Sequence, residues 1–379
     1  MSINITSYNA ICNLGNDIET IYRKSLQGCI WDFCYLDGYI KNNWIYAGKI
    51  NANLPEIKDK DYNLRCNGII LKTIKKLEDN IENIICEYGE KNTAIVAATT
   101  NSGVEEFEKT HNPKHYELAN PSEFLHKYLN LKGFYTTVST ACSSGIKAFS
   151  LARDLLNNNA AECVIVVCVD TLAKVPLYGF NSLEVLSNKP SLPFGKNRTG
   201  MNIGEACSIF IIEKNVKNTV EIMGIGESSD IYHSTTPDPD AKEAVNAITQ
   251  ALEEAKIKPS EVDYINAHAT GTIANDIMEA KAINSVFGEN IPVSSTKPMT
   301  GHCLGAAAGI ETALCCMLLD NFNGKLYPHI YDGEYDETLP KIRLVQKNEI
   351  FKQCEICVCN SFGFGGTNAI LVLGKHNEE

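Results

Sequence analysis

The stretch that decides the fold is TTVSTACSSG, residues 136–145, followed by IKAFSLARDLL at 146–156. The first segment is β-branched and ends in small residues, which is typical of a strand running into a turn. The second carries apolar residues at helical spacing, so a helix begins at or near Gly145. A strand that turns directly into a helix is the repeating unit of an α/β fold. Cys142 therefore lies at the N-terminal end of a helix.

The same alternation of strand and helix continues along the chain. Short β-branched runs predict buried strands at 3–7, 93–98, 163–169, 207–213, 220–225, 262–266 and 356–359, and in the closing run AILVLG. Helical periodicity falls between them, at 69–88, 145–157, 241–255, 273–286 and 308–320. This order predicts an α/β architecture whose sheets are covered by helices on both faces.

Two pairs of similar segments indicate an internal duplication. GIKAFSLARDLL from Gly145 resembles GIETALCCMLLD from Gly309, and AIVAATT resembles YINAHAT. The members of each pair lie about 165 to 170 residues apart. We therefore expect two halves, at 1–216 and 217–379. Matches this short also arise by chance, so the residues alone leave the duplication open.

Composition narrows the class of protein. The 379 residues, 44% of them hydrophobic, can bury a large core. No apolar run approaches the roughly 20 residues that span a bilayer, and the N-terminus lacks the pattern of a signal peptide. The fifteen cysteines, an odd number, lie mostly in apolar runs. Because free cysteine packs as a small apolar residue in reducing compartments, we expect a cytoplasmic protein without disulfides.

The net charge of −12 argues against nucleic acid as the main partner, because phosphate binding needs a basic surface. An acidic protein partner needs only a local basic patch. Six residues near the start of the 69–88 helix are candidates for one: Lys58, Lys60, Arg65, Lys72, Lys75 and Lys76. An ordinary solvated helix face explains the same spacing.

Three residue types form a candidate catalytic set. At a helix start, unpaired N–H groups and the helix dipole favour a thiolate at Cys142 and could hold an oxyanion on a bound acyl group. His268, in NAHATGT, and His302, in STKPMTGHCLGAAAG, follow strands among small residues. A cysteine with two histidines suits acyl transfer through a thioester. Lys297 could tune this site electrostatically. Taken singly, each of these residues could also be structural.

The segment NSFGFGGTNA, residues 360–369, predicts a tight glycine-rich turn between strands. It has no P-loop lysine and no GxGxxG pattern, so nucleotide binding is not expected. A turn that supplies a backbone N–H and a mobile Phe364 fits it better. The C-x-x-C in CEICVC, residues 354–359, has no second Cys/His pair at zinc-finger spacing, so a metal site is not expected there.

Together these motifs resemble the β-ketoacyl-acyl-carrier-protein synthases, the elongating ketosynthases of fatty-acid and type II polyketide pathways. The segments TACSSG, NAHATGT…ND…EAKAI, SSTKPMTGHCLGAAAGIE and NSFGFGGTNA occur in the family's order. The resemblance implies a thiolase-like fold, with two pseudo-duplicated α/β halves in five αβαβα layers. It implies a decarboxylative Claisen condensation between an acyl-enzyme thioester and malonyl-acyl-carrier protein, in the elongation of a fatty acid, polyene or polyketide.

The resemblance also implies the role of each site residue. Cys142 would be the nucleophile, and His268 and His302 would assist decarboxylation, supported by Lys297 and Glu311. Phe364 would gate the acyl pocket, and its backbone amide, together with that of Cys142, would form the oxyanion hole. Thr270 and Thr272 would bind the pantetheine arm. No metal and no cofactor beyond the phosphopantetheine of the carrier is implied. The implied partners are acyl-carrier protein and a second ketosynthase-like subunit, in a homodimer or heterodimer.

The sequence departs from the family's pattern in places. The family's PFD…RDG segment is PFGKNRTG here, with Gly195 and Thr199 where acidic residues are expected, and Ala269 stands where glycine is usual. These departures put loop structure and the partner interface in doubt. In the docking surface for the carrier, we expect Arg65, with Lys196 and Arg198 as further candidates.

Four alternatives to an elongating enzyme that works without a chain-length-factor-like partner stay open. A subunit active only in a heterodimer with a chain-length-factor-like partner would show the same motifs. A thiolase would need a second cysteine in the last glycine-rich loop, which has none, although Cys359 precedes it. A Cys–His hydrolase would leave one histidine without a role, and a non-catalytic assembly subunit would not need the Cys–His–His set.

Overall fold

The computed structural model describes residues 2–41 and 43–375. Its strands are β1 Ile3–Cys12, β2 Cys34–Ile40, β3 Asn43–Ala47, β4 Thr93–Ala98, β5 Tyr135–Val138, β6 Cys163–Asp170, β7 Ala206–Lys214, β8 Val220–Ser229, β9 Tyr264–Asn266, β10 Pro292–Ser294, β11 Arg343–Leu344, β12 Ile356–Gly363 and β13 Thr367–Gly374. Each strand predicted from the sequence is present, with ends that differ by a few residues. The short strands β2, β3, β10 and β11 escaped prediction because their segments have no extended apolar run.

The helices are α1 Ile18–Leu26, α2 Arg65–Ile74, α3 Glu78–Tyr88, α4 Val104–Thr110, α5 Pro113–Tyr116, α6 Asn120–Tyr128, α7 Ser144–Asn157, α8 Lys174–Ser182, α9 Lys242–Ala255, α10 Ile273–Phe287, α11 Lys297–Thr300 and α12 Ala307–Asn321, with 3-10 turns η1 Pro259–Glu261 and η2 Leu304–Ala306. The helix predicted at 69–88 is two helices. The break follows from a turn in which Leu77 donates its N–H to Ile74 and buries its side chain.

The main strands form one eleven-stranded sheet in the order β11-β10-β9-β12-β13-β8-β1-β7-β6-β4-β5. Its two parts correspond to the two expected sheets. They are joined where Asn4 and Ile5 of β1 pair with Glu221 and Val220 of β8. Within each part the strands nearest the site run parallel, as in β4–β6 and β9–β12, and are fully buried. Near-continuous apolar runs such as CVIVVCV are what a strand covered on both faces requires.

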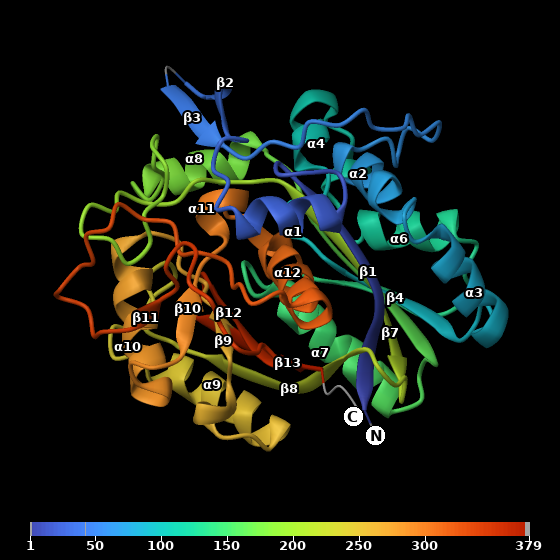
Figure 1. The fold of residues 1–379 in the computed structure, drawn as a ribbon. Coiled ribbons are helices and arrows are strands. Elements are labelled where there is room, and N and C mark those ends of the chain that lie inside the picture. The colour runs from blue at the N-terminus through green and yellow to red at the C-terminus, as the bar shows by residue number, and fades with distance from the viewer. Residues whose placement is uncertain (1, 42, 376–379) are drawn as a thin grey trace.

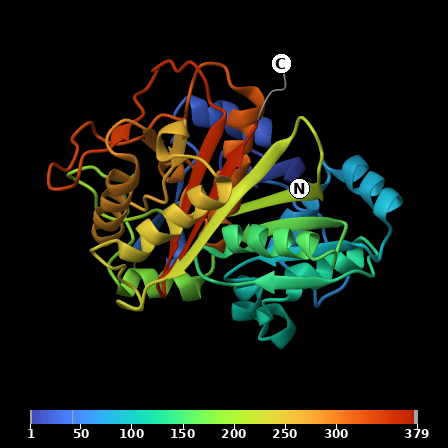
Figure 2. The same cartoon turned by 90° about the horizontal axis from the view of Figure 1, so that it is seen from below.

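Helices cover both faces of each part and give five layers. Helices α7 and α12 lie in the middle, between β4, β6 and β7 on one side and β8, β12 and β13 on the other (Figure 1). Helices α2, α3 and α6 cover the outer face of the first part. On the second part, α9 lies along β8 and β13, and α10 packs beside α9 (Figure 2). The expected αβαβα arrangement is confirmed. Residues 215–219 connect β7 to β8, and the division into halves at 216/217 stays a prediction.

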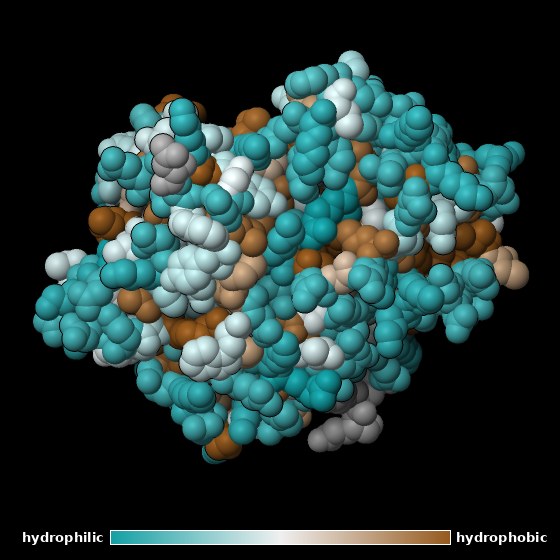
Figure 3. Space-filling view, turned by 90° about the horizontal axis from the view of Figure 1, so that it is seen from above, coloured by the Kyte–Doolittle hydropathy of each residue, from teal (hydrophilic) through white to brown (hydrophobic). Residues whose placement is uncertain are grey.

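One helical stretch, Leu304–Asn321, is long and apolar enough to cross a membrane by length and composition alone. It contains α12, which is the central helix of the fold, and 89% of the stretch is buried within the protein. Its apolar character is therefore explained by the core. Figure 3 shows the face that lies at the top of Figure 1. This face is mostly hydrophilic, with separate hydrophobic patches between hydrophilic residues.

Candidate active site

Cys142 lies in a tight turn between β5 and α7. Ala141 takes a left-handed conformation, with φ 53°. Thr140 donates its N–H to Ser144 Oγ at 2.8 Å, and Ser144 Oγ donates to Ala141 O at 2.6 Å. These two hydrogen bonds close the turn and hold the cysteine just before the first residue of the helix. The structure thus places Cys142 at a helix start, where the sequence predicted it.

The surroundings of the Cys142 thiol raise its pKa. The residue is 7% exposed, and burial raises the pKa of the thiol to about 12. The ammonium of Lys297 and a hydrogen bond from the Phe364 backbone act in the opposite direction but do not outweigh burial. Burial thus opposes the thiolate that the helix start alone favours. Its thiol is protonated near pH 7, and nucleophilic attack needs a base to accept the proton.

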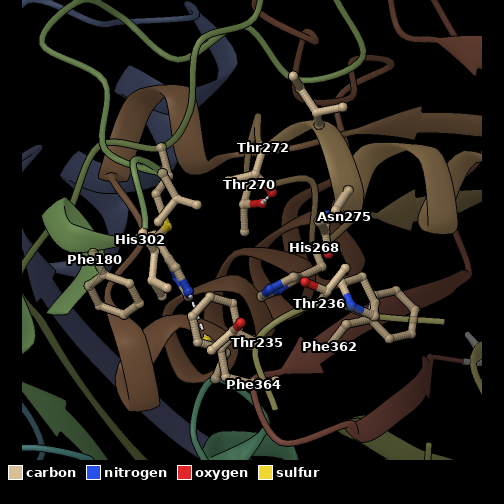
Figure 4. Close-up of a pocket in the computed structure, with 18 of the residues that line it drawn as sticks. Phe180, Thr235, Thr236, His268, Thr270, Thr272, Asn275, His302, Phe362 and Phe364 are labelled. Atoms are coloured by element: carbon tan, nitrogen blue, oxygen red, sulfur yellow. Dashed lines mark hydrogen bonds between the residues drawn. The ribbon is translucent and has the colours of Figure 1, made fainter. Parts of the chain in front are cut away.

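A base is within reach. The Nε2 atom of His302 lies 2.9 Å from Cys142 Sγ. The rings of His268 and His302 point into the same space, 5.3 Å apart and nearly perpendicular (Figure 4). Both histidines are 1% exposed, and burial, with Lys297 as a second cause, lowers the pKa of each imidazole well below its usual range. Both rings are neutral near pH 7, so each can accept or donate a proton.

Lys297 and Glu311 form a buried ion pair behind the histidines. Lys297 begins α11 and Glu311 lies in the first half of α12; their side chains are 2% and 1% exposed. Lys297 Nζ lies 2.5 Å from Glu311 Oε1. Burial raises the pKa of Glu311 to about 7, and Lys297 opposes that shift. The pair connects the segment before His302 to the central helix and places a cation beside both imidazoles.

Two carboxylates on α10 hold the turn that carries His268. The Glu279 carboxylate accepts hydrogen bonds from the N–H groups of His268 and Ala269, at 2.7 and 2.5 Å. Asp276 accepts from Gly271 N–H at 3.2 Å and from Phe194 N–H at 2.8 Å. Burial raises the pKa of both carboxyl groups, that of Asp276 to about 7. Asp276 and Glu279 both belong to the segment ND…EAKAI, and no role was predicted for either.

The turn at Ala269 has an unusual backbone. Its φ is 33°, in the left-handed region that favours glycine, and Gly271 follows at φ 78°. Glycine is the residue usual in the family at position 269, which fits this geometry. Here the two hydrogen bonds to Glu279 hold an alanine in the same conformation.

The glycine-rich loop lies over the thiol, between β12 and β13. The ring of Phe364 packs edge-on against Phe180, 5.7 Å away (Figure 4), and it lines the same cavity as Cys142. Gly365 and Gly366 have φ of 84° and 77°. A Cβ on Gly366 would lie 2.0 Å from Asp230 O, so only glycine fits there. The loop thus brings a backbone N–H and an aromatic ring to the nucleophile.

These groups line one cavity of about 380 Å³. Thr270 and Thr272 lie in its wall, and their hydroxyl oxygens are 2.9 Å apart. The cavity also contains Cys142, His268, His302 and Phe364, whereas Lys297 and Glu311 lie behind it. The structure therefore brings all eight predicted site residues together, six of them in one cavity and two in the wall behind the histidines.

Cys142, His268 and His302 could also be viewed as metal ligands, because one atom from each lies within 4.8 Å of the others. A thiolate and two imidazoles are suitable ligands for zinc. The ammonium of Lys297 beside the two imidazoles repels a cation, as its lowering of both histidine pKa values shows. The donor set therefore fits acyl chemistry better than it fits a metal.

The expected docking residues differ in their exposure. Arg65 is half-buried, and its guanidinium binds the fully buried carboxylate of Glu205 at 2.7 Å. Arg198 is 4% exposed and pairs with Asp336 at 2.6 Å and with Asp276 at 3.7 Å. Each arginine neutralises a carboxylate inside the protein, whereas Lys196 is exposed. Arg198 also shows how the PFGKNRTG loop is fixed without the usual acidic residues.

Comparisons with known proteins agree with this geometry. Residues 119–218 match the family model of the β-ketoacyl synthase N-terminal domain, and residues 219–329 match that of the C-terminal domain. The chain is 35% identical to 3-oxoacyl-[acyl-carrier-protein] synthase 2 of Coxiella burnetii over 65% of this chain and 63% of that protein. It is 28% identical to the Staphylococcus aureus protein of the same name over 98% and 97% of the two chains.

Solved structures give the same result over the whole chain. A chain from the complex of a ketosynthase with its chain length factor, from Xenorhabdus doucetiae, superposes with a TM-score of 0.94 at 33% identity. That match covers 99% of this chain and 98% of the other. The ishigamide ketosynthase/chain length factor shares the fold, with a TM-score of 0.86 at 22% identity and 99% coverage of each chain.

Proposed function

This chain belongs to the β-ketoacyl synthase family, and on that premise we propose that it joins an acyl group on Cys142 to malonyl-acyl-carrier protein. The products are β-ketoacyl-acyl-carrier protein and carbon dioxide. The observation that carries this proposal is a cysteine thiol 2.9 Å from one neutral imidazole, with a second imidazole facing the same cavity. A dyad would suffice for hydrolysis, whereas decarboxylation followed by carbon–carbon bond formation uses both histidines.

The first half-reaction loads the acyl group. Cys142 Sγ attacks the carbonyl carbon of the acyl-carrier thioester as its proton passes to His302 Nε2. The backbone N–H groups of Cys142 and Phe364 hold the oxyanion of the tetrahedral intermediate. The carrier's thiolate then leaves and takes up the proton from His302. This order is supported by the burial of Cys142, which raises the pKa of its thiol and favours the protonated form before substrate binds.

The second half-reaction forms the new bond. Malonyl thioester loses carbon dioxide, and the electron pair of the broken bond passes into an enolate whose oxygen accepts hydrogen bonds from His268 and His302. For this step neutral His302 carries its one ring proton on Nε2, whereas in the loading step that proton is on Nδ1 and Nε2 is free to accept. The enolate carbon attacks the acyl-Cys142 carbonyl, and the sulfur leaves as a thiolate. One proton from solvent restores the thiol. Lys297 and Glu311 position the two histidines, and Thr270 and Thr272 bind the pantetheine arm that carries each substrate.

The test is condensation by a Cys142→Ala protein. We expect no β-ketoacyl product from malonyl-carrier and acyl-carrier in an intact-mass assay. A cerulenin-type epoxide should label wild-type protein at Cys142 and leave the variant unlabelled. Cys86→Ala is the matched control, because Cys86 is an exposed thiol on α3, and it should retain both properties. Undiminished condensation by Cys142→Ala would overturn the proposal.

A second subunit completes the proposed assembly. The similarity to a chain from a ketosynthase–chain length factor complex supports a heterodimer with a related subunit, and a homodimer is the other arrangement. If a heterodimer is required, the isolated chain should be labelled at Cys142 but should release no product until the partner subunit is added. Within this proposal the protein works in the cytoplasm on carrier-bound substrates, without a metal and with no cofactor beyond the carrier's phosphopantetheine.

A thiolase is the second enzyme considered, and its base would be a second cysteine in the cavity. Among the residues described, Cys142 is the one cysteine that lines the cavity. Cys359 is fully buried in the interior of the sheet and does not line it. A malonyl thioester should therefore be required, and product from two acetyl thioesters alone would favour the thiolase.

A further inference from the structure

Asp170 is a fully buried carboxylate beside the active site. It ends β6, after the apolar run CVIVVCV, and its negative charge is one of the causes that raise the pKa of Cys142. It does not line the cavity, so it does not touch a substrate there. Two other buried carboxylates, Glu205 and Glu311, are each paired with a cation. Within the described residues, no lysine or arginine forms an ion pair with Asp170, so hydrogen-bond donors alone compensate its charge.

The donors to Asp170 come from two segments that are far apart in the sequence. Three residues after β4 donate from two hydroxyl and two backbone N–H groups, at 2.7 to 3.0 Å: Thr99, Thr100 and Asn101. The N–H group of Gly305, in η2, donates to Asp170 Oδ2 at 2.7 Å. Burial raises the pKa of Asp170, and the hydrogen bonds from the loop after β4 oppose that shift. Asp170 therefore joins the loop after β4 to the turn that precedes α12.

Gly305 packs directly against the carboxylate. A Cβ on Gly305 would lie 2.8 Å from Asp170 Oδ2 and 3.0 Å from Thr100 Cγ2, so a glycine is needed to bring the N–H group this close. The residue before it, Leu304, has a φ of 53°, and the chain turns sharply there between His302 and α12. The contact with Asp170 fixes the end of that turn.

The ring of His302 depends on the backbone for its direction. Among the described residues, its Nδ1 atom has no hydrogen-bond partner. The backbone of His302 donates its N–H to Asn202 O at 2.7 Å, and its carbonyl accepts from Gly204 N–H at 3.0 Å. These two bonds hold the residue itself. Three residues later, the bond from Gly305 N–H to Asp170 holds the other end of the turn.

We propose that Asp170 is a positioning residue: its carboxylate fixes the turn after His302 and so sets the 2.9 Å approach of His302 Nε2 to Cys142 Sγ. The inference rests on the proposed function, because that function uses this approach to pass the thiol proton to the imidazole. A displacement of about 1 Å can lower the rate of such a step by about a hundredfold. Asp170 thus acts on catalysis through His302 and not by contact with substrate.

Asp170→Asn tests the inference, because an amide of the same shape cannot accept from every donor that the carboxylate binds. Whichever way the amide turns, its NH2 group faces a backbone N–H, either that of Gly305 or those of Thr100 and Asn101. A buried N–H group without an acceptor weakens the turn. We expect kcat for condensation to fall by about tenfold or more, and KM for malonyl-carrier to change by less than about twofold, because the pantetheine arm binds elsewhere.

Glu213→Gln is the matched control. Glu213 is another buried carboxylate, 8% exposed, which accepts a hydrogen bond from the Tyr88 hydroxyl at 2.9 Å and does not line the cavity. Its replacement should change kcat by less than about twofold. Equal losses of kcat in Asp170→Asn and Glu213→Gln would mean that any buried carboxylate has this effect, and would overturn the inference.

Gly305→Ala breaks the same contact from the other side. It should lower kcat by about tenfold or more with KM unchanged, because its Cβ pushes the turn away from the carboxylate. The double variant Asp170→Asn/Gly305→Ala should lose no more than about twofold beyond the worse single variant, since both changes break one contact. If the two losses multiply instead, the residues act separately and the inference fails.

Nuclear magnetic resonance separates this inference from the proposed activity. In protein labelled with carbon-13 at histidine Cε1, the signal of His302 is identified by its loss in His302→Gln. It should shift in Asp170→Asn and in Gly305→Ala, which changes no charge, and stay in place in Glu213→Gln. If wild-type protein condenses nothing while these shifts occur, the proposed function fails and the effect of Asp170 on the position of His302 stands. If the signal stays in place in Gly305→Ala and Asp170→Asn, the inference fails whatever the activity.

Discussion

The buried pair of Lys297 and Glu311 makes stability depend on pH, and Lys297→Met should expose that dependence. Both side chains are almost inaccessible, and their charged atoms are 2.5 Å apart. Burial raises the pKa of Glu311 to about 7 even though Lys297 opposes the shift. Without Lys297 the pKa of Glu311 rises further, because an opposing charge has gone. The variant therefore holds its proton to a higher pH than wild type does.

The magnitude follows from the two pKa values of Glu311. A carboxyl whose pKa is raised on folding lowers stability as the pH climbs from its unfolded to its folded pKa. In wild type that window runs from pH 4.5 to about pH 7. The free energy of unfolding falls by about 1.4 kcal/mol for each pH unit within it, and by about 3 kcal/mol in all. At pH 7 Glu311 of wild type is already half ionised, so wild type loses only about 0.4 kcal/mol more from it between pH 7 and pH 8, whereas Lys297→Met continues to lose about 1.4 kcal/mol per unit.

The assay is urea unfolding followed by far-ultraviolet circular dichroism at pH 7 and pH 8. The difference in free energy of unfolding between wild type and Lys297→Met should grow by about 1 kcal/mol over that unit. Lys297→Met/Glu311→Gln is the control, because it has no carboxyl to titrate, and its difference from wild type should stay constant. If Lys297→Met behaved like this control, Glu311 would not be the titrating partner and the reasoning would be refuted.

Three other predictions concern the turns around the site. Gly366→Ala should cut the rate of condensation by about tenfold or more, because its Cβ would lie 2.0 Å from Asp230 O at a φ of 77°. Gly365→Ala should lower the rate less, because Gly365 is exposed and a Cβ there has nothing within 4 Å. Equal losses in the two variants would contradict the steric argument. Ala269→Gly should raise the free energy of unfolding by about 1 kcal/mol in urea titration, because it relieves an alanine at φ 33°, and a decrease would show that its conformation is not strained. The rate of iodoacetamide labelling of Cys142 should rise about tenfold per pH unit from pH 7 to 9, since the pKa of the thiol is raised to about 12, whereas a plateau in that range would mean that the thiolate forms near neutrality.

The sequence predicted those features that depend on local pattern. The buried strands β4 and β6 read as unbroken β-branched runs, and the turn into α7 followed from small residues between a strand and a helical period. Cys142, His268 and His302 could be chosen because each stands among small residues at the end of a strand or the start of a helix. Local pattern was sufficient there because the backbone geometry of these turns limits which residues fit.

Properties that depend on burial by distant segments could not be predicted. The helix start favours a thiolate at Cys142, but the segments packed around it desolvate the thiol and raise its pKa instead. Arg65 looked like a surface cation because nothing nearby in the sequence indicated Glu205, which is 140 residues away. Glu279 gained its role only when the fold set its carboxylate against the N–H groups of the His268 turn.

The site exists because the two central helices meet at their N-terminal ends. A Cβ on Gly145, near the start of α7, would lie 2.9 Å from Ala308 Cβ and 3.0 Å from Gly309 N, at the start of α12. Larger residues would therefore push α7 away from α12. Cys142 precedes the first helix by two residues and His302 precedes the second by five, so the 2.9 Å between their side chains depends on this close approach. The Gly-Ile start shared by the two helices thus has a physical reason: each half contributes a helix whose first turn must be small, and the nucleophile and its base lie on opposite sides of that contact.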